Sequence, residues 1–267
     1  MSETPFNSPL IIAHRGDSAN APENTLAAFR MALAKGADGL EFDVQLSRDG
    51  VPVVIHDHDL KRTGIRPERV AELTAAELGK INVGSWFNSK YPKLADPGFA
   101  EEFVPTLVSV LENTISCEGP IYVELKCEGS EYAELVTRVC EVLRNFGGLE
   151  RLIVKSFRLA AIPLVRTLLP EVQTAALFAP EAMNFLRRRR HIIDLALQIG
   201  AHQLSLHRML ASARLLKHAN EAGIPVTIWT ADRPKWVDRC RKRGIRSLIT
   251  NDPGKQLERR GQVTAGQ

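Results

Sequence analysis

IIAHRGDSANAPENTLAAFRMALAKGADGLEFDVQL, residues 11–46, contains a complete strand–helix–strand pattern. Its apolar start predicts a strand. The middle part predicts a helix with Pro22 and Glu23 in its first turn and Gly36 as its C-terminal cap. The final residues, GLEFDVQL, predict a second strand. A strand, a helix and another strand in succession favour a parallel sheet, so this stretch predicts an α/β fold.

The same rhythm recurs along the chain. Strand-like runs lie near residues 10, 40, 121, 152, 173, 203, 225 and 246, and helical patterns separate most of them. The run VPVVIHD (51–57) is expected to pair with the second strand after the turn SRDG. Eight strand–helix units predict a (β/α)8 TIM barrel, and the 267 residues suit one such domain over 1–267. The alternative is an open, doubly wound sheet, which usually has fewer strands.

One segment, residues 57–105, breaks this rhythm. It contains charges, turn residues and the aromatic residues Trp86, Phe87 and Tyr91, but no clear strand–helix unit. We interpret it as a small insertion after the second strand, with the aromatic residues as its own small core.

Composition and charge describe an ordinary globular chain. The net charge of +4 suits an anionic substrate but does not require nucleic acid. The basic run RRRRH (187–191) is expected to be a solvated helix face, because no aromatic residues alternate with it. We therefore expect a small-molecule partner and no nucleic-acid partner.

The cysteines and the apolar runs bear on the compartment. Cys117, Cys127, Cys140 and Cys240 show no C-x-x-C spacing, and few scattered cysteines are typical of a reducing compartment. The N-terminus lacks a signal-peptide pattern, and no apolar run has transmembrane length. The sequence thus predicts a cytoplasmic protein without stable membrane insertion.

Ionisable residues gather at the predicted strand ends. Strand alternation places Glu41 and Asp43 on one face of the second strand, and Glu124 on the same face as Tyr122 and Lys126 in a later strand. His14 and His56 close their own runs. The carboxyl ends of the strands are where such barrels build active sites.

Three inward carboxylates cannot all stay charged in a dry barrel mouth, because they repel one another and lose hydration. A divalent cation would resolve this conflict for Glu41, Asp43 and Glu124, and ligation by oxygen alone favours Mg²⁺ or Ca²⁺. Each of these residues, taken singly, is more simply interpreted as structural. That interpretation, however, needs a separate reason for the ionisable residues at each of several strand ends.

The same set of residues predicts a chemistry. His14 and His56 can act as acid and base in one turnover, and Arg15 and Lys126 supply positive charge for a phosphate. With a divalent ion, these groups suit hydrolysis of a phosphate diester. The residues leave open which imidazole is the acid, and whether the nucleophile is water or a hydroxyl group of the substrate.

The chain also resembles glycerophosphodiester phosphodiesterases from about residue 10 to residue 253. The segments that carry the resemblance are AHRGDSANAPENTLAAF, GLEFDVQLSRDGVPVVIHDHDLKRTG, GSWFNSKY, VPTLVSVLE, IYVELK, VKSF, IPVTIWTAD and LITNDPG. The resemblance implies a TIM barrel with a small insertion. It also implies metal-dependent hydrolysis of glycerophosphodiesters, such as glycerophosphocholine or glycerophosphoethanolamine, to sn-glycerol 3-phosphate and an alcohol.

The resemblance further implies a role for each site residue. The acid–base pair would be His14 and His56, the metal ligands Glu41, Asp43 and Glu124, the phosphate contacts Arg15 and Lys126, and the glycerol-side contact Trp229. Two positions depart from the pattern, since many members have Gln at Lys155 and Asn at Asp232. Both departures are expected near the barrel mouth, where they bear on substrate preference.

Other functions predict different features. A phosphatidylinositol-type phospholipase C or a lysophospholipase D would share the chemistry and would need an exposed apolar rim, which Trp86, Phe87 and Tyr91 could form. A non-catalytic binding barrel would lack a His or a metal carboxylate. An aldolase or isomerase would need a Schiff-base Lys or a lone Glu base. The sequence does not give the oligomeric state.

Overall fold

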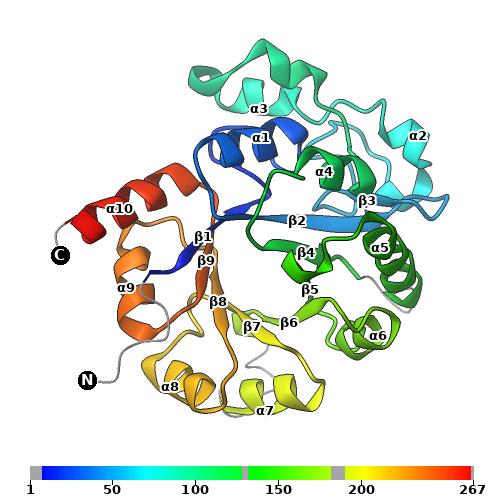
Figure 1. The fold of residues 1–267 in the computed structure, drawn as a ribbon. Helices are drawn as coiled ribbons and strands as arrows, with labels where there is room; N and C mark the ends of the chain where they lie inside the picture. The colour runs from blue at the N-terminus through cyan, green and yellow to red at the C-terminus, as the bar shows by residue number, and fades with distance from the viewer. Residues whose placement is uncertain (1–7, 128–131, 182–189, 266–267) are drawn as a thin grey trace.

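The computed structural model describes residues 8–127, 132–181 and 190–265. Within these residues, eight parallel strands close into a barrel (Figure 1). β1 pairs with β9 on one side and with β2 on the other, and this pairing closes the sheet. The barrel strands are β1 (Leu10–His14), β2 (Gly39–Leu46), β4 (Ile121–Leu125), β5 (Leu152–Ser156), β6 (Gln173–Phe178), β7 (Gln203–His207), β8 (Val226–Trp229) and β9 (Ser247–Thr250). The predicted TIM barrel is confirmed, and the open-sheet alternative is wrong.

Helices surround the barrel and alternate with its strands (Figure 1). They are α1 (Leu26–Ala34), α4 (Leu107–Asn113), α5 (Tyr132–Phe146), α6 (Ala161–Leu168), α7 (Arg190–Gln198), α8 (Ala213–Glu221), α9 (Lys235–Arg243) and α10 (Pro253–Ala265). Apolar side chains fill the layer between the helices and the outer faces of the strands. This burial is the main favourable contribution to folding.

The first helix begins later than the sequence predicts. Thr25 caps α1 by accepting a hydrogen bond from the backbone N–H of Ala28. The preceding Asn24 has a φ of 58°, which is left-handed and cannot continue into a helix. The predicted start at Pro22 and Glu23 is therefore wrong, because these residues belong to the loop that follows β1.

The barrel interior holds an apolar layer below a polar one. Ile12, Ile153 and Ile249 point inward and pack around the fully buried ring of Tyr122. The Tyr122 hydroxyl lies 3.0–3.2 Å from the side-chain oxygens of the polar residues Gln203, Thr227 and Ser247. The barrel is thus a packed core below its mouth and not a channel.

β3 (Pro52–Val54) runs antiparallel to β2 outside the barrel, so the expected pairing of the VPVVIHD run is present. The segment that follows contains short helices: η1 (Val70–Glu72), α2 (Ala75–Leu78), α3 (Ser85–Lys90), η2 (Pro92–Leu94) and η3 (Pro97–Glu101). Trp86 and Phe87 are buried with Phe99 against Ala21 and Ala28 of the α1 region. The expected separate aromatic core is therefore wrong, because Trp86 and Phe87 pack the segment onto the α1 region, while Tyr91 lies beside Phe87 and is 39% exposed.

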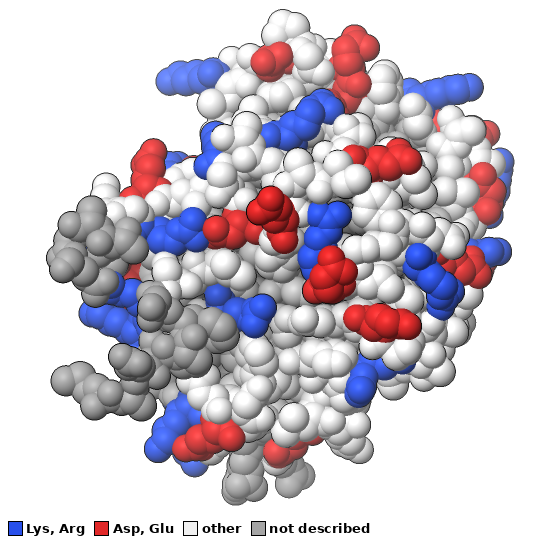
Figure 2. Space-filling view, viewed as in Figure 1, with Lys and Arg blue, Asp and Glu red and all other residues white. Residues whose placement is uncertain are grey.

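The surface carries both signs of charge. Lys and Arg side chains alternate with Asp and Glu side chains over the face that Figure 2 shows, without a broad area of one sign. Of the basic run at 187–191, residues 187–189 lie outside the described residues, and α7 begins at Arg190. Among the helices of the described chain, none is both long and apolar enough to cross a membrane.

Candidate active site

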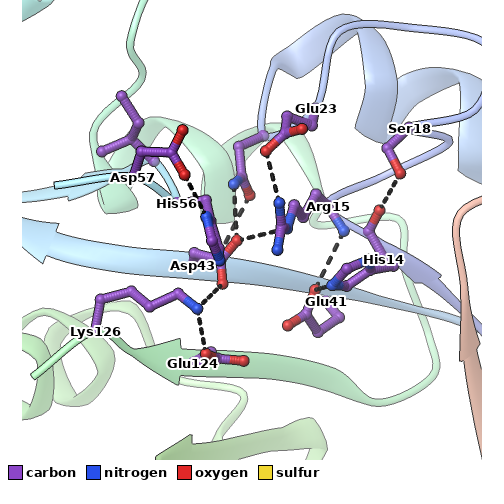
Figure 3. A network of polar contacts seen from close by, with 12 residues as sticks. His14, Arg15, Ser18, Glu23, Glu41, Asp43, His56, Asp57, Glu124 and Lys126 are labelled. Carbon is purple, nitrogen blue, oxygen red and sulfur yellow. Dashed lines mark hydrogen bonds and ion pairs between the residues drawn. The ribbon is translucent and has the colours of Figure 1, made fainter. Parts of the chain in front are cut away.

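Polar side chains from three neighbouring strands meet at the carboxyl end of the barrel (Figure 3). The parallel register aligns His14 of β1 with Glu41 of β2, and Asp43 of β2 with Glu124 of β4. Because alternate residues of a strand share a face, Glu41 and Asp43 both point into the barrel mouth. The sheet register is therefore what brings the predicted carboxylates together.

The carboxylates of Glu41, Asp43 and Glu124 form a buried cluster. One oxygen of each lies within 4.8 Å of the others, and the residues are 0%, 0% and 5% exposed. Glu41 Oε1 and Asp43 Oδ1 accept no well-aligned hydrogen bond, although the ammonium groups of Lys155 and Lys126 lie 2.7 and 3.1 Å from them. Hard divalent cations prefer carboxylate oxygens gathered in this way, so this donor set fits Mg²⁺ or Ca²⁺.

Asn24 fixes the orientation of Asp43. Its amide nitrogen donates to Asp43 Oδ2 at 2.9 Å, and its amide oxygen accepts from the Asp43 backbone N–H at 3.3 Å. The left-handed backbone of Asn24, which Asn tolerates better than most residues, turns the side chain toward β2. The loop after β1 thus positions a carboxylate on the next strand.

Two lysines lie against the carboxylate cluster. Lys155 Nζ is 2.7 Å from Glu41 Oε1 and 3.1 Å from Glu124 Oε2, and Lys155 is 1% exposed. Lys126 Nζ is 3.1 Å from Asp43 Oδ1 and also pairs with Glu124. Burial alone would lower the pKa of both ammonium groups, but the neighbouring carboxylates outweigh it and raise each pKa. Both lysines are therefore cationic.

The same contacts act on the carboxylates. Burial would raise the pKa of Asp43, but Arg15 and Lys126 outweigh it and hold that pKa well below its ordinary range. Burial would also raise the pKa of Glu124, but Lys155 and Lys126 outweigh it and lower that pKa. The cluster is thus anionic at neutral pH and is balanced by cations.

His14 is held by an amide. Its Nδ1 lies 2.7 Å from Asn251 Oδ1, and Asn251 Nδ2 donates to Asp232 Oδ2 at 3.1 Å. The Asp232 carboxylate, which only accepts hydrogen bonds, therefore orients the Asn251 amide oxygen toward His14. His14 Nδ1 must then carry the proton, which leaves the lone pair on Nε2, 3.8 Å from Glu41 Oε2. Burial lowers the pKa of His14 below its ordinary value of 6.5.

His56 is held by a carboxylate. Its Nδ1 donates to Asp57 Oδ1 at 2.6 Å, and Asp57 Oδ2 accepts from Arg62 Nε at 2.6 Å. Arg62 also donates twice to Glu23, at 2.7 and 2.8 Å, and Glu23 accepts from Arg15 at 2.7 Å. A continuous ionic network thus links the imidazole of His56 to the guanidinium of Arg15 through Arg62, and Figure 3 shows its two ends, His56 with Asp57 and Arg15 with Glu23.

Trp229 lies elsewhere on the barrel mouth. It ends β8, which β9 separates from β1. Its ring packs edge-on against Phe157 and His207, with centroid distances of 5.5 and 5.1 Å. The other predicted site residues, by contrast, lie around one point, and a cavity of about 360 Å³ opens beside His56 and Lys126. This volume leaves room for a small substrate.

Sequence reasoning did not assign the groups that position these residues. Asn251, Asp232 and Arg62 each contact a predicted site residue or its direct partner. Lys155 was expected near the mouth, but its ion pairs with two of the carboxylates were not expected. The pairing of β1 with β9 could have indicated Asn251, because it follows β9 as Arg15 follows β1.

Comparisons with known proteins agree with this geometry. Residues 14–255 match the model of the glycerophosphoryl diester phosphodiesterase family. A glycerophosphodiester phosphodiesterase of Caldanaerobacter subterraneus subsp. tengcongensis is 32% identical over 244 residues, which are 91% of this chain and 94% of the relative. One from Bacillus subtilis is 28% identical over 91% of this chain and 84% of its own length. The structure is also similar to an Oleispira antarctica phosphodiesterase in complex with the product sn-glycerol-3-phosphate, with a TM-score of 0.82 and 27% identity over 94% of this chain and 96% of that one.

Proposed function

The chain belongs to the glycerophosphoryl diester phosphodiesterase family and is a phosphoric diester hydrolase, and from this premise we propose its substrate and mechanism. It hydrolyses glycerophosphodiesters, such as glycerophosphocholine or glycerophosphoethanolamine, to sn-glycerol 3-phosphate and an alcohol. The observation that carries this proposal is the meeting of three carboxylates, two imidazoles and the cations Arg15 and Lys126 at the barrel mouth.

Glu41, Asp43 and Glu124 would hold the divalent cation, Mg²⁺ or Ca²⁺. When bound, such an ion polarises a phosphoryl oxygen and stabilises developing negative charge. Burial opposes the ionised forms of Asp43 and Glu124, but the nearby cations Arg15, Lys126 and Lys155 outweigh burial and lower the pKa of both carboxyl groups.

Arg15 and Lys126 bind the phosphate of the substrate. Arg15 is anchored through Glu23 and Asp43, and Lys126 through Asp43 and Glu124, so both cations are already oriented before the substrate arrives. Fixed cations cost little reorganisation when charge develops on the phosphoryl oxygens. Trp229 would line the glycerol side of the mouth.

His14 acts as the general base. Asn251 fixes the proton on Nδ1, so Nε2 presents a lone pair toward the barrel mouth. Burial lowers the pKa of His14, which keeps the imidazole neutral at pH 7. Nε2 can therefore accept the proton of the nucleophile. This nucleophile is either water, which gives sn-glycerol 3-phosphate directly, or the neighbouring glycerol hydroxyl, which gives a cyclic phosphate that water then opens.

His56 acts as the general acid. The Asp57 carboxylate accepts a hydrogen bond from Nδ1 at 2.6 Å, which fixes the orientation of the ring and leaves Nε2 for the substrate. The protonated Nε2 then donates to the oxygen of the leaving alcohol. The cavity beside His56 gives that alcohol a place to depart.

Release of sn-glycerol 3-phosphate from glycerophosphocholine and glycerophosphoethanolamine tests the proposal. We expect release with Mg²⁺ or Ca²⁺, loss of release in EDTA, and about a 10²-fold to 10⁴-fold lower kcat in His14→Ala. His218→Ala, which removes an imidazole from α8, is the matched control and should keep full activity. Equal activity in His14→Ala and His218→Ala would contradict the assignment of His14.

Two further expectations are part of this proposal. The four free cysteines support a cytoplasmic location. We also propose that residues 1–267 act as one catalytic domain on a small-molecule substrate, because residues 57–105 pack directly on α1 and supply Arg62 to the network around His56.

A further inference from the structure

A cavity of about 340 Å³ lies at the barrel mouth, next to the ends of β7 and β8. It is distinct from the cavity beside His56, since the two have no lining residue in common. Its lining residues are Arg208, Thr230, Asp232, Arg233, Lys235, Trp236 and Arg239. Four of these are cations and one is an acid, which is a much more basic composition than that of the whole chain, with 35 basic and 31 acidic residues.

The four cations of this basic cavity lack acidic partners. Within the described part of the chain, none of Arg208, Arg233, Lys235 and Arg239 forms an ion pair. Arg208 donates through Nη1 to the Thr230 carbonyl at 3.0 Å, and Arg239 stacks on the ring of Trp236 at 4.8 Å. These contacts fix the side chains without neutralising them. In contrast, the cations at the carboxylate cluster are all paired.

Asp232 offsets only one of the four positive charges of the basic cavity. Its Oδ1 accepts from the backbone N–H of Asn251 at 2.8 Å and from the Thr250 hydroxyl at 3.2 Å, and Oδ2 accepts from Asn251 Nδ2, so its carboxylate is held toward β9 and away from the arginines. The lining therefore keeps an excess of positive charge, and an anion bound among these cations would reduce their mutual repulsion.

The basic cavity adjoins the candidate active site. Asn251 contacts His14 with its amide oxygen and Asp232 with its amide nitrogen, so a single side chain lies between the general base and the cavity wall. On the other side, Arg208 contacts His207, whose ring packs on Trp229. A substrate held at the barrel mouth can therefore extend past Asn251 or Trp229 into this cavity.

We propose that the basic cavity binds a second phosphate group of the substrate, so that the preferred substrates are glycerophosphodiesters with two or more phosphates, such as glycerol units joined by phosphodiesters. This inference rests on the proposed function and specifies its substrate class. Arginine recognises phosphate through paired N–H donors. A phosphodiester group is negatively charged, and it would therefore balance the excess positive charge of the cavity lining.

The test compares glycerophosphoglycerol with its two-phosphate homologue, bis(glycerophospho)glycerol, which adds one glycerophosphate unit. We expect the wild-type enzyme to have a roughly 10-fold to 100-fold higher kcat/KM for the two-phosphate substrate. Arg233→Ala/Lys235→Ala should abolish this preference and leave glycerophosphoglycerol turnover unchanged, because neither residue contacts the catalytic groups. Arg241→Ala/Lys242→Ala removes the same charge from the other end of α9 and should keep the preference.

A binding measurement without turnover tests this inference separately from the proposed function. Calorimetric titration in EDTA, where turnover is not expected, should show tighter binding of bis(glycerophospho)glycerol to the wild type and to the α9 control than to Arg233→Ala/Lys235→Ala. Equal binding by all three proteins would overturn the inference, even if no diester were hydrolysed. Inorganic phosphate is the last probe. If it bound at the basic cavity while the two substrates were cleaved equally well, the cavity would be a free-phosphate site and the substrate assignment would be wrong.

Discussion

At the scale of single residues, the two histidines differ through their Nδ1 partners. His14 faces the neutral amide of Asn251, which fixes the proton on Nδ1, whereas Nδ1 of His56 donates to the carboxylate of Asp57. Identical side chains thereby acquire opposite tasks. The difference depends on one neighbouring atom in each case, so it can be changed by single substitutions.

Asn251→Asp should raise the pKa of His14. The new carboxylate would stabilise the imidazolium, so the base would lose activity at a higher pH than in the wild type. Because burial lowers the wild-type pKa below 6.5, the acid limb of kcat/KM should lie below pH 6.5 in the wild type and move upward in the variant. A pH profile measures both limbs, and an unmoved acid limb would contradict the role of Asn251.

Lys155→Gln should strengthen metal binding. The ammonium of Lys155 contacts two of the three proposed ligands, Glu41 and Glu124, and therefore repels a cation from the site. Removing it should lower the Kd for Mg²⁺ or Ca²⁺ by roughly 10-fold, measured by calorimetry. Lys217→Gln on the surface of α8 is the matched control and should not change the Kd.

The same variant carries a cost in stability. Without the metal, loss of Lys155 leaves Glu41 and Glu124 buried with less compensation, which typically costs about 3–5 kcal/mol of the free energy of unfolding. Added metal should raise the free energy of unfolding of Lys155→Gln by more than that of the wild type, and so restore much of the loss. Equal metal-induced stabilisation of both proteins would count against direct competition.

At the scale of elements, the segment of residues 57–105 contributes to the site as well as to packing. Arg62 comes from this segment and ties Asp57 to Glu23, while its guanidinium lies 5.7 Å from the ring of the buried Trp86. The segment thus positions His56 through Asp57. Residues 57–105 therefore have a role at the barrel mouth, because they supply the arginine that holds Asp57 beside His56.

Arg62→Ala should lower kcat by about 10-fold to 100-fold with a smaller change in KM. The reason is that a misplaced His56 reduces the stabilisation of the transition state more than it reduces substrate binding. Arg62→Lys should recover part of the activity, since it keeps one donor for Asp57. Arg66→Ala, which removes an exposed arginine of the same segment, should have little effect. A change in KM alone would contradict this positioning role.

At the scale of the whole molecule, the barrel mouth concentrates charge that the fold must balance. Three buried carboxylates face three cations, Arg15, Lys126 and Lys155, so the site is nearly neutral before metal and substrate bind. This balance allows a TIM barrel to keep ionised groups in a dry mouth. It also makes the stability of the whole fold depend on pH.

Acid should therefore destabilise the metal-free protein. The pKa values of Asp43 and Glu124 are lower in the folded state than their ordinary values of 3.8 and 4.5. Their stabilising contribution is present above about pH 4.5 and is lost as pH falls through the lower folded values. Urea unfolding in EDTA from pH 7 to pH 3 measures the loss. A constant midpoint over that range would contradict it.

Local sequence pattern was enough to predict the barrel and the carboxylates and histidines that meet in its mouth. Periodicity predicted eight strands, because apolar runs separated by amphipathic helices can bury their surfaces only as a parallel sheet covered by helices. Alternation within β2 placed Glu41 and Asp43 on one face, and the motif around His14 and Arg15 indicated the family. These features can be predicted because they depend on the order of apolar and polar residues within a single strand or helix.

The partner of each side chain across the mouth depends on the packing of distant segments. The contact of Asn251 with His14, the ion pairs of Lys155 with two carboxylates and the basic cavity around Arg208 all join residues far apart in sequence. Such contacts arise from the register in which the strands pair around the closed barrel. Local pattern cannot specify them, because it fixes the face of a strand but not the partner across it.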